Sequence, residues 1–481
     1  MFFHGVKASE ISTDIISTIE TTAGLPVIVG TAPVNLTENP LSNVNKPVLC
    51  NSFDEFVAAF GYSDNWDKYT LCEAAYSEFM LYGVKPAVFI NVLDPASHKM
   101  TISGSMYNVT NDLVEIDNDA LLNSFIVKEN SYSTVAAIKN TDYTLAFDTE
   151  GKAIISIVSG GSLDGKTSIY ISYDRLNPSA VTYQDIIGGV NTNGETKGLE
   201  LVNTIYTMFG MIPGIIAAPG WSENPTVATV MKAKASTLSS LFKCICLTDV
   251  NTSQVRNYQN VYTWKNSNNY TGANQIVCWP CVRNGEQIYH MSTHLMGVIG
   301  AMDADNDDIP YMSPSNHTLQ ATGLCLKDGT EILLSLDQAN ILNSQGIVTG
   351  LNFSGGFKIW GNRLAAFPSS SDPKDIFICC RRMLDWQQKT FILNYWQRVD
   401  APLIPRVIRS IVDSESIRLN GLVARGYLIA AEIQFNEDEN PTTDLLAGKV
   451  KLHTKLTCPV PAEEIEEIVE YDASAYSLLF E

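Results

Sequence analysis

The C-terminal part of the chain opens with the stretch GFKIWGNR, residues 356 to 363, in which glycine and asparagine bracket a short apolar strand. A helix is expected from Asp375 to Arg398, because its apolar residues recur at mixed spacings of three and four and form one broad face. A second helix is expected from about Ile404 to Leu422. Its apolar stripe would comprise Val407, Ile411, Ile417 and Leu419, with Arg406, Arg409 and Arg418 facing water.

Two strands and an extended tail follow these helices. Tyr427 to Phe435 is an apolar run, and Lys449 to Leu456 alternates between basic and apolar side chains, which is the pattern of a half-buried strand. Beyond the prolines at 459 and 461, the β-branched and aromatic content of Ile465 to Tyr471 predicts a final strand with no later segment to pair with. Such a strand can join a sheet in another subunit. We expect its contacts to come from Ile465, Val469 and Tyr471.

The N-terminal segment, Val6 to Ala23, has an ambiguous period. Ile11, Ile15 and Ile19 share one side of a strand, but they also fit a helix at a spacing of four. The many Ile and Thr residues favour a strand. This strand would either be a sheet edge in its own domain or an arm that reaches another subunit, and the sequence leaves both open.

Strands and helices alternate in the middle of the chain. Two helices separate the apolar strands Pro26 to Gly30 and Pro86 to Val92, an order that predicts a parallel sheet with helical crossovers. Ser52 with Glu55, and Thr70 with Glu73, have the spacing of capping boxes at the helix starts. The alternation resumes after residue 194, in segments 199–209, 211–217, 227–242, 244–247, 275–278 and 290–302.

Residues 96 to 193 break this alternation. Short alternating runs are separated there by Gly, Asn, Asp and Ser turns, which is typical of a small antiparallel domain inserted at exposed loops. We therefore expect an α/β multidomain chain with a mostly parallel sheet core, an inserted antiparallel β domain, a C-terminal α/β domain and extended terminal arms. The expected limits are 1–23 for the N-terminal arm, 24–95 with 194–350 for the core, 96–193 for the inserted domain, 351–460 for the C-terminal domain and 461–481 for the C-terminal arm.

Composition narrows the class of protein. The formal net charge of -20 over 481 residues disfavours binding along nucleic acid or an anionic membrane, because the mean field repels phosphate. No apolar run approaches the roughly 20 residues that span a bilayer, and the first residues lack a signal-peptide pattern. The ten scattered cysteines fit reduced thiols better than a disulfide framework. We expect a protein that is made and kept in a cytoplasm.

One stretch matches the phosphate-binding P-loop pattern. Residues 160 to 167, GGSLDGKT, fit it letter for letter, but a P-loop needs a helix that begins at its Lys-Thr end. Residues 168 to 173 alternate as a strand instead, so we expect the glycines to form a hairpin connection in the insertion.

Two cysteines and two histidines have the spacing of redox or metal-binding residues, but the surrounding sequence does not support either function. Cys278 and Cys281 have the spacing of a redox dithiol or half a zinc site, but no helix is expected to begin at Cys278. His290 and His294 could share a helix face, with Asp303 or Asp305 as a third metal ligand. Histidines whose hydrogen bonds are satisfied within the fold are the more common case. We expect no catalytic residue, no metal and no cofactor.

Several stretches together resemble sheath proteins of contractile phage tails and of R-type bacteriocin particles. They are the opening at 356 to 363, the run RRMLD at 381 to 385 and the proline-containing exit into the terminal segment. Residues 4 to 6, 24 to 33 and 337 to 347 are similar to that family as well. The resemblance covers both ends and the middle of the chain and leaves out residues 96 to 194.

The resemblance implies a structural subunit that polymerises helically around a tail tube and shortens to drive the tube through a cell envelope. It implies a homo-oligomer, a tube protein and a baseplate as partners, no nucleic acid and no membrane insertion, and a virion or tail-like particle assembled in a bacterial host's cytoplasm. Two alternatives remain open at this point. One is an α/β enzyme that binds nucleotide or performs thiol redox chemistry, and the other is a static filament or surface-layer protein.

Overall fold

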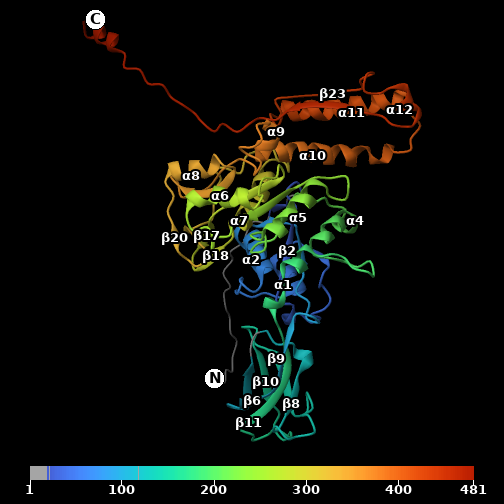
Figure 1. Cartoon of the computed structure of the whole chain (residues 1–481), viewed down its shortest axis with the longest axis vertical. Coiled ribbons are helices and arrows are strands. Elements are labelled where there is room, and N and C mark those ends of the chain that lie inside the picture. The colour runs from blue at the N-terminus through green and yellow to red at the C-terminus, as the bar shows by residue number, and fades with distance from the viewer. Residues whose placement is uncertain (1–18, 21, 117–118, 481) are drawn as a thin grey trace, which may run out of the picture.

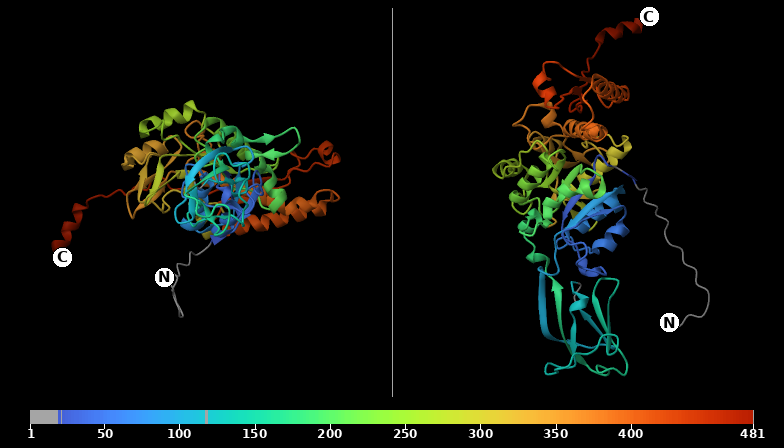
Figure 2. Two further views of the ribbon diagram at one scale, coloured as in Figure 1. Left: turned by 90° about the horizontal axis from the view of Figure 1, so that it is seen from below. Right: turned by 90° about the vertical axis from the view of Figure 1, so that its right-hand side faces the viewer.

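The computed structural model describes residues 19–20, 22–116 and 119–480 as an elongated, mixed α/β molecule with several sheets. The α/β class expected from the sequence is confirmed. Figure 1 shows three regions along the long axis, with the central sheet in the middle, the antiparallel insertion at one end and the C-terminal helices at the other. Figure 2 shows the same order from a second side.

The central sheet has eight strands. The six inner strands pair in parallel, and the two edge strands are antiparallel to their neighbours. Its order is β22 (Phe357–Trp360), β21 (Ile347–Asn352), β16 (Gln275–Cys278), β15 (Ile245–Asp249), β14 (Ile215–Ala217), β2 (Pro26–Gly30), β5 (Ala87–Asn91) and β3 (Pro47–Cys50). Every residue of β2 and β5 is buried, as expected for inner strands of a parallel sheet that is covered on both faces.

Both edges of this sheet differ from expectation. β3 was not expected as a strand at all. β22 was expected to open the C-terminal domain, but it pairs with β21 and Ile359 is fully buried in the main core. The chain reverses at Gly355 and Gly356, whose φ angles of 73° and 95° suit glycine, so β21 and β22 form a hairpin. The domain limits given above remain a prediction.

Helices of the expected type cover the sheet. They are α1 (Phe53–Phe60), α2 (Thr70–Ala75) with its π-helical continuation η2 (Tyr76–Leu81), α5 (Pro225–Ser236), α6 (Tyr258–Ser267), α7 (Met291–Asp305) and α8 (Leu336–Asn343). Shorter pieces are α3 (Tyr183–Ile187), η5 (Gly198–Thr204) and α4 (Ile205–Phe209), and a small antiparallel sheet contains β17 (Cys281–Asn284), β18 (Gln287–Tyr289), β19 (Gly323–Cys325) and β20 (Glu331–Ile332).

The two expected capping boxes have different outcomes. Ser52 caps α1 and accepts the Glu55 N–H at 3.1 Å, while the Glu55 carboxylate accepts the N–H of Asn51, one residue before the cap. The second box is wrong. Tyr69 is the N-cap of α2, and the Glu73 side chain turns away from its own helix to contact α7.

Two buried carboxylates hold the N-terminus of α7 at the carboxyl ends of the central strands. Glu73 accepts the backbone N–H of His290 at 2.6 Å, and Asp249 of β15 accepts that of Ser292 at 3.0 Å. His290 Nδ1 lies 2.8 Å from Glu73, and its Nε2 faces Glu223 at 3.7 Å. These acids satisfy backbone donors that the helix itself leaves unpaired, and their negative charge suits the positive end of the helix.

The same contacts shift the titration of the groups involved. Burial lowers the pKa of His290, but the adjacent Glu73 carboxylate more than offsets this and raises it to about 9. Burial raises the pKa of Glu223 to about 7, against the opposing charge of His290. His290 is therefore protonated at neutral pH and forms an ion pair with Glu73 inside the core.

The insertion consists of two three-stranded antiparallel sheets around their own apolar core. The first sheet has the order β7 (Leu113–Ile116), β10 (Ala153–Ile157) and β9 (Tyr143–Phe147), and the second has β6 (Lys99–Asn108), β11 (Ser168–Leu176) and β8 (Ile126–Lys128). The separate core extends as far as Tyr173, whereas Leu176, Val181 and Ile186 pack into the main core. Lys99 and Leu176 are direct cross-strand neighbours, so the ends of the insertion lie together.

Excising the insertion should leave a folded core. Replacing residues 99–176 with a short Gly/Ser linker closes a gap between neighbouring backbones and removes only Leu176 of the three main-core residues just named, so a cooperative thermal transition should persist in circular dichroism. The matched variant replaces 96–193 and also removes Val181 and Ile186, so it should melt earlier or not fold. Equal stability of the two variants would contradict this boundary.

Stability should fall as pH rises through two windows. A group whose pKa is higher in the folded state than in the unfolded state contributes stability below its unfolded-state pKa, and this stability is lost as the pH rises to the folded-state pKa. The window runs from pH 4.5 to about 7 for Glu223 and from pH 6.5 to about 9 for His290. In urea titrations followed by tryptophan fluorescence, Glu223→Gln should remove the lower window. Glu73→Gln should remove the upper one and cost roughly 3–5 kcal/mol, because it leaves a buried charge unpaired. A Glu73→Gln variant with the full wild-type slope from pH 7 to 9 would contradict the assignment.

Candidate subunit interface

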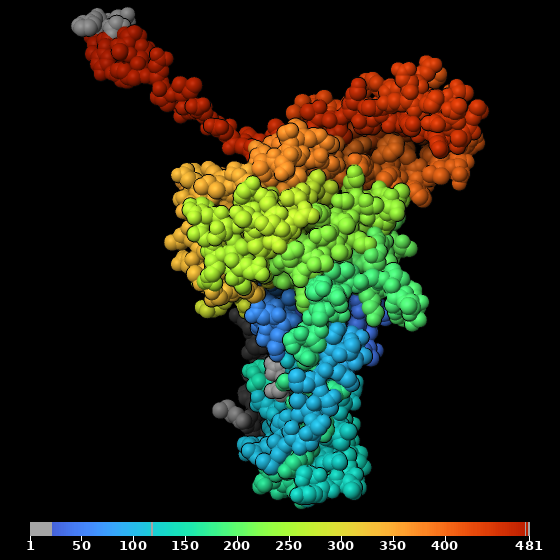
Figure 3. Space-filling view, in the orientation of Figure 1, coloured from blue at the N-terminus to red at the C-terminus, as the bar shows by residue number. Residues whose placement is uncertain are grey.

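The C-terminal unit consists of two long helices and a two-stranded ribbon. Its elements are α9 (Pro373–Ile376), α10 (Ile378–Tyr395), α11 (Pro405–Ala424), β23 (Ala430–Gln434), α12 (Thr442–Leu446) and β24 (His453–Thr457). Met383 of α10, Leu419 and Leu422 of α11 and Ile433 of β23 form its apolar core. Figure 3 shows the unit overhanging one side of the molecule while the tail leaves on the other.

Buried polar contacts join α10 to the rest of the molecule. Arg382 forms a two-pronged ion pair with Asp303 of α7, with Nη1 2.8 Å from Oδ1 and both side chains almost fully enclosed. Asn274 donates to Asp385 at 2.9 Å, and Lys389 donates to the Pro213 carbonyl at 2.8 Å. Because isolated buried charges are costly, these pairs fix the position of α10 on the core.

A buried carboxylate joins α10 to α11. Glu415 is fully enclosed and accepts hydrogen bonds from Gln387 at 2.7 Å, from Tyr395 at 3.3 Å and from Arg418 Nε at 3.1 Å. Burial acts to raise the pKa of Glu415, but the hydrogen bonds from Arg418 and Gln387 lower it overall. Arg418 was expected to face water and bridges the helices instead. Ile417 was expected to be buried and is 73% exposed, whereas Leu419 is buried as expected.

The ribbon has open edges. β23 and β24 pair antiparallel from Ala430↔Thr457 to Gln434↔His453 and have no third strand among the described residues. A groove of about 550 Å³ lies between β24 and α10, lined by Leu384, Phe391 and Ile392 of the helix and by Leu452 and Leu456 from the strand segment. The layer that covers α10 is therefore incomplete at the free edge of β24.

The tail beyond β24 is extended and exposed. No strand forms between Ile465 and Tyr471 within the single chain, where the sequence predicted one. Ile465, Val469 and Tyr471 are 89%, 80% and 75% exposed, so these apolar side chains have almost no cover in their own subunit. The short helix η7 (Ala473–Phe480) ends the described tail.

The tail is attached to the body at Glu463, beyond the prolines at 459 and 461. Glu463 forms a bidentate ion pair with Arg363, with Nε 2.8 Å from Oε1, and the Arg363 guanidinium stacks over Phe367 at 3.9 Å. Pro459 to Pro461 therefore lie between β24 and this clamp. The freely extended part of the tail starts after Glu463.

The N-terminal arm is held in a similar way. Ile11 and Ile15 lie outside the described residues, and Ile19 belongs to the two-residue strand β1 (Ile19–Glu20), which pairs in parallel with β4 (Val84–Lys85) of the same chain. Thr22 and Ala23 donate their backbone N–H groups to Asp308 at 2.9 and 2.8 Å. The root of the arm at Thr22 and Ala23 is thus tied to the core through Asp308.

The P-loop match forms a connection between two sheets. Residues 160–167 lead from β10 to β11, which belong to different sheets of the insertion, so the expected hairpin is wrong. A strand follows Thr167, as predicted from the alternation, and not the helix that phosphate binding needs. Lys166 forms an ion pair with Glu129.

The cysteines and histidines considered as metal ligands are buried in the fold. Cys278 ends β16 and Cys281 begins β17, both are enclosed, and burial raises the pKa of each thiol. His294 Nδ1 contacts the Tyr82 hydroxyl at 2.9 Å, and burial lowers the pKa of His294 to about 3. Since Asp303 is paired with Arg382, it cannot complete a site with His290. The described residues contain no cluster of three or more metal-type ligands.

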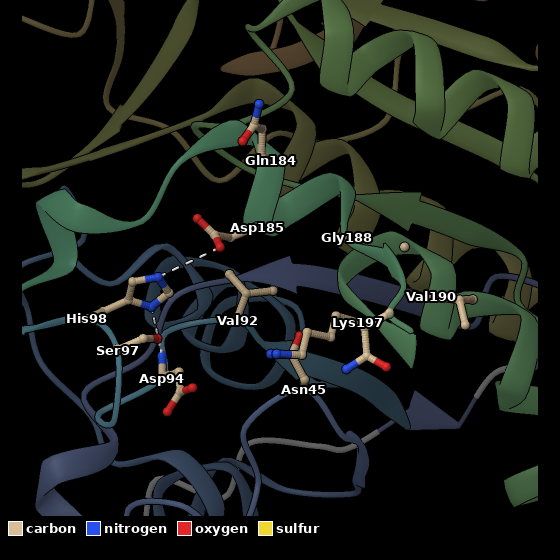
Figure 4. Close-up of a pocket in the computed structure, with 12 residues that line it drawn as sticks. Asn45, Val92, Asp94, Ser97, His98, Gln184, Asp185, Gly188, Val190 and Lys197 are labelled. Atoms are coloured by element: carbon tan, nitrogen blue, oxygen red, sulfur yellow. Dashed lines mark hydrogen bonds and ion pairs between the residues drawn. The ribbon is translucent and has the colours of Figure 1, made fainter. Parts of the chain in front are cut away.

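A polar cavity of about 270 Å³ lies where the insertion joins the core (Figure 4). His98 Nδ1 accepts the N–H of Asp94 at 3.0 Å, and its Nε2 faces Asp185 at 3.7 Å. Asp94 precedes the insertion and Asp185 follows it, so His98 links the two connections. The cavity belongs to this joint, and no sequence motif pointed to it.

Two phage tail sheath proteins are similar to this chain in sequence. No protein-family model matches the chain, and no helix in the described ranges combines the length and apolarity needed to cross a bilayer. The tail sheath protein of Burkholderia phage BcepMu is 27% identical over 475 residues, covering 96% of this chain and 95% of the relative. The tail sheath protein of Escherichia phage P2 is 25% identical, over 60% of this chain and 71% of the relative. Because the BcepMu match covers 96% of this chain, it extends into residues 96–194, which the motifs quoted above leave out.

Solved structures share the fold. A chain of the anti-feeding prophage baseplate superimposes with a TM-score of 0.59 at 15% identity, covering 98% of this chain and 99% of that one. A chain of the contracted PVC sheath complex, an extracellular contractile injection system, gives 0.57 at 12% identity over 99% of both chains. By sequence along its length and by fold, the chain is a relative of contractile tail sheath proteins, and its role is that of a structural sheath subunit.

Proposed function

We propose that this chain polymerises into a helical sheath around a tail tube, attaches to a baseplate, and shortens to drive the tube through a target cell envelope. The observation that carries the proposal is the match to a phage tail sheath protein along nearly the whole chain. The exposed tail, which has apolar side chains and no strand partner within its own chain, supports it. The role is structural and not enzymatic. The particle would be assembled in the cytoplasm of a bacterial host, without nucleic acid or membrane insertion.

The tail is suited to joining subunits. Ile465, Val469 and Tyr471 stay exposed in the single chain, and burying them against a neighbour would recover free energy of roughly 25 cal/mol per Å² of apolar surface. A strand added to a neighbour's sheet also gains main-chain hydrogen bonds that depend little on side-chain fit. The arm residues Ile11, Ile15 and Ile19 would contribute in the same manner at the other terminus.

The free edge of β24 is the acceptor that the structure favours. A strand placed there would cover Leu384, Phe391 and Ile392 of α10 and fill the groove beside the ribbon. Charge favours the same pairing. Glu463, Glu464, Glu466, Glu467 and Glu470 give the tail an acidic character, while Lys449, Lys451 and Lys455 are exposed around β24. Opposite charges across adjacent strands stabilise a sheet.

Linked arms allow the subunit bodies to move without separating. Both arm roots are fixed to the body, at Asp308 and at Arg363, so rearrangement would take place in the short segments beyond these points. Shortening would then release free energy stored at assembly, and no bound nucleotide would be consumed.

Deleting Glu464 to Glu481 should abolish polymerisation and spare the monomer. The deleted residues bury little of their own chain, so the thermal midpoint should stay close to wild type. Each lost strand removes several intersubunit hydrogen bonds of about 0.5–1.5 kcal/mol each, repeated at every subunit. Negative-stain microscopy should show dispersed particles where the full chain forms hollow cylinders. Cylinders from the truncated chain would refute the role of the tail, and flat sheets from the full chain would favour a static layer.

Charge reversal should test the acceptor. Lys449→Glu with Lys455→Glu should weaken cylinder formation by placing like charges opposite the tail, and adding Glu466→Lys with Glu467→Lys should restore it in part. The control, Lys46→Glu with Lys166→Glu, makes the same charge change far from the ribbon and should assemble normally. Equal loss in the control, or no rescue by the tail changes, would place the tail elsewhere. The critical concentration from sedimentation gives the magnitude.

A further inference from the structure

Three cysteines meet where the tail leaves the C-terminal unit. Cys379 and Cys380 lie in the first turn of α10, and Cys458 directly follows β24. The first two form a small cluster with Ile376 and Phe377, and Cys458 packs against it. The Cys380 side chain interacts with those of both Cys379 and Cys458.

This cluster differs from the other cysteines of the chain. All ten lie in the described part, and Cys458 alone among them is only partly buried, so small molecules in solution can reach it. Hydrogen bonds among the three thiols lower the pKa of Cys380, which favours the thiolate there, and raise the pKa of Cys379 and Cys458. Cys278, in contrast, is enclosed, and burial raises the pKa of its thiol.

The position of the pair in the chain gives a bond between them a large effect. α10 is the first long helix of the C-terminal unit and β24 is its last strand, so a link from Cys380 to Cys458 would enclose α11 and β23 in a loop of roughly 80 residues. A cross-link of that span restricts the unfolded chain and stabilises the unit it encloses.

We propose that Cys380 and Cys458 form a disulfide bond when the protein meets a small-molecule disulfide such as oxidised glutathione. One thiolate of the pair attacks the glutathione disulfide, forms a mixed disulfide and releases one glutathione thiolate. The second cysteine, after losing its proton to solvent, attacks the protein sulfur of the mixed disulfide and releases the second glutathione. Two protein thiols are oxidised, and one glutathione disulfide is reduced to two thiols.

The bond would change how the arm is anchored. A pull on the tail that overcomes the Arg363–Glu463 clamp is transmitted to β24, which is held by its ladder to β23 and by side-chain packing. With the disulfide in place, the same pull passes directly to α10, which is ion-paired to Asp303 in the core. This benefit rests on the proposed sheath function, in which tails link subunits. The chemistry of the pair does not.

The test uses the full-length chain, reduced and then freed of reductant. After incubation with oxidised glutathione, peptide mapping without reduction should find residues 380 and 458 in one disulfide-linked pair, with two of the ten thiols lost. Dithiothreitol should reverse the link. Limited proteolysis should then cut the C-terminal unit several-fold more slowly in the oxidised protein than in the reduced protein.

Matched variants assign the partners. Cys379→Ser should keep the link, whereas Cys380→Ser and Cys458→Ser should lose it. A Cys379–Cys458 link, a stable glutathione adduct on Cys458, or no reaction under saturating glutathione disulfide would each overturn the proposal, and the wild-type map alone decides if a variant does not fold. Cylinders without the link would refute only the disulfide, and the link without cylinders would refute only the sheath function.

Discussion

The buried ion pair between Arg382 and Asp303 is the contact on which the arrangement of the chain depends. It joins α10 of the C-terminal unit to α7, whose N-terminus is itself held at the ends of the central strands. Gly24, at the root of the N-terminal arm, packs against the same pair so closely that an added Cβ would lie 2.9 Å from Asp303 Oδ2. The arm root, the core and the C-terminal unit thus meet at one place. Removing either charge would leave its partner buried without compensation.

This convergence affects what a sheath subunit can do. Both arms leave from fixed points, at Asp308 and Arg363, and the element that carries the ribbon is rigidly attached to the core. The ribbon is therefore held to the body through α10 and is not a loosely tethered piece. The insertion lies at the opposite end of the molecule (Figure 1) and joins the core through polar contacts that include His98 and Asp119, away from this anchoring.

The sequence predicted those features that depend on local pattern. The α/β class, the two C-terminal helices and the inner strand Gln275–Cys278 follow from periodicity, and the rejection of a P-loop helix follows from the alternation after Thr167. Features set by distant contacts were not predictable in this way. Glu73 has the spacing of a helix cap, but its partner His290 lies 217 positions away. The pairing of β22 with β21 could not be foreseen, because a four-residue strand carries no sign of the sheet it will join.

The conformation of the C-terminal unit and its tail could be foreseen only in part, for a physical reason. The apolar content of Ile465 to Tyr471 indicated a strand, but strands need a ladder partner, and a single chain supplies none for this segment, so it stays extended. Arg418 was placed in water because nothing in its own helix shows that Gln387 and Tyr395 of α10 converge on Glu415. The clamp at Arg363 was likewise invisible, because it joins residues 100 positions apart.

The acidic residues of the tail have a consequence for the protein before it assembles. Exposed apolar strands invite aggregation, and two tails could pair with each other as readily as with a ribbon. Glutamates are interspersed among Ile465, Ile468 and Val469, and no Lys or Arg follows Lys455, so two tails brought together repel along the segment 463–472. The charge that would suit the tail to the lysines of the proposed acceptor therefore also opposes pairing between two tails.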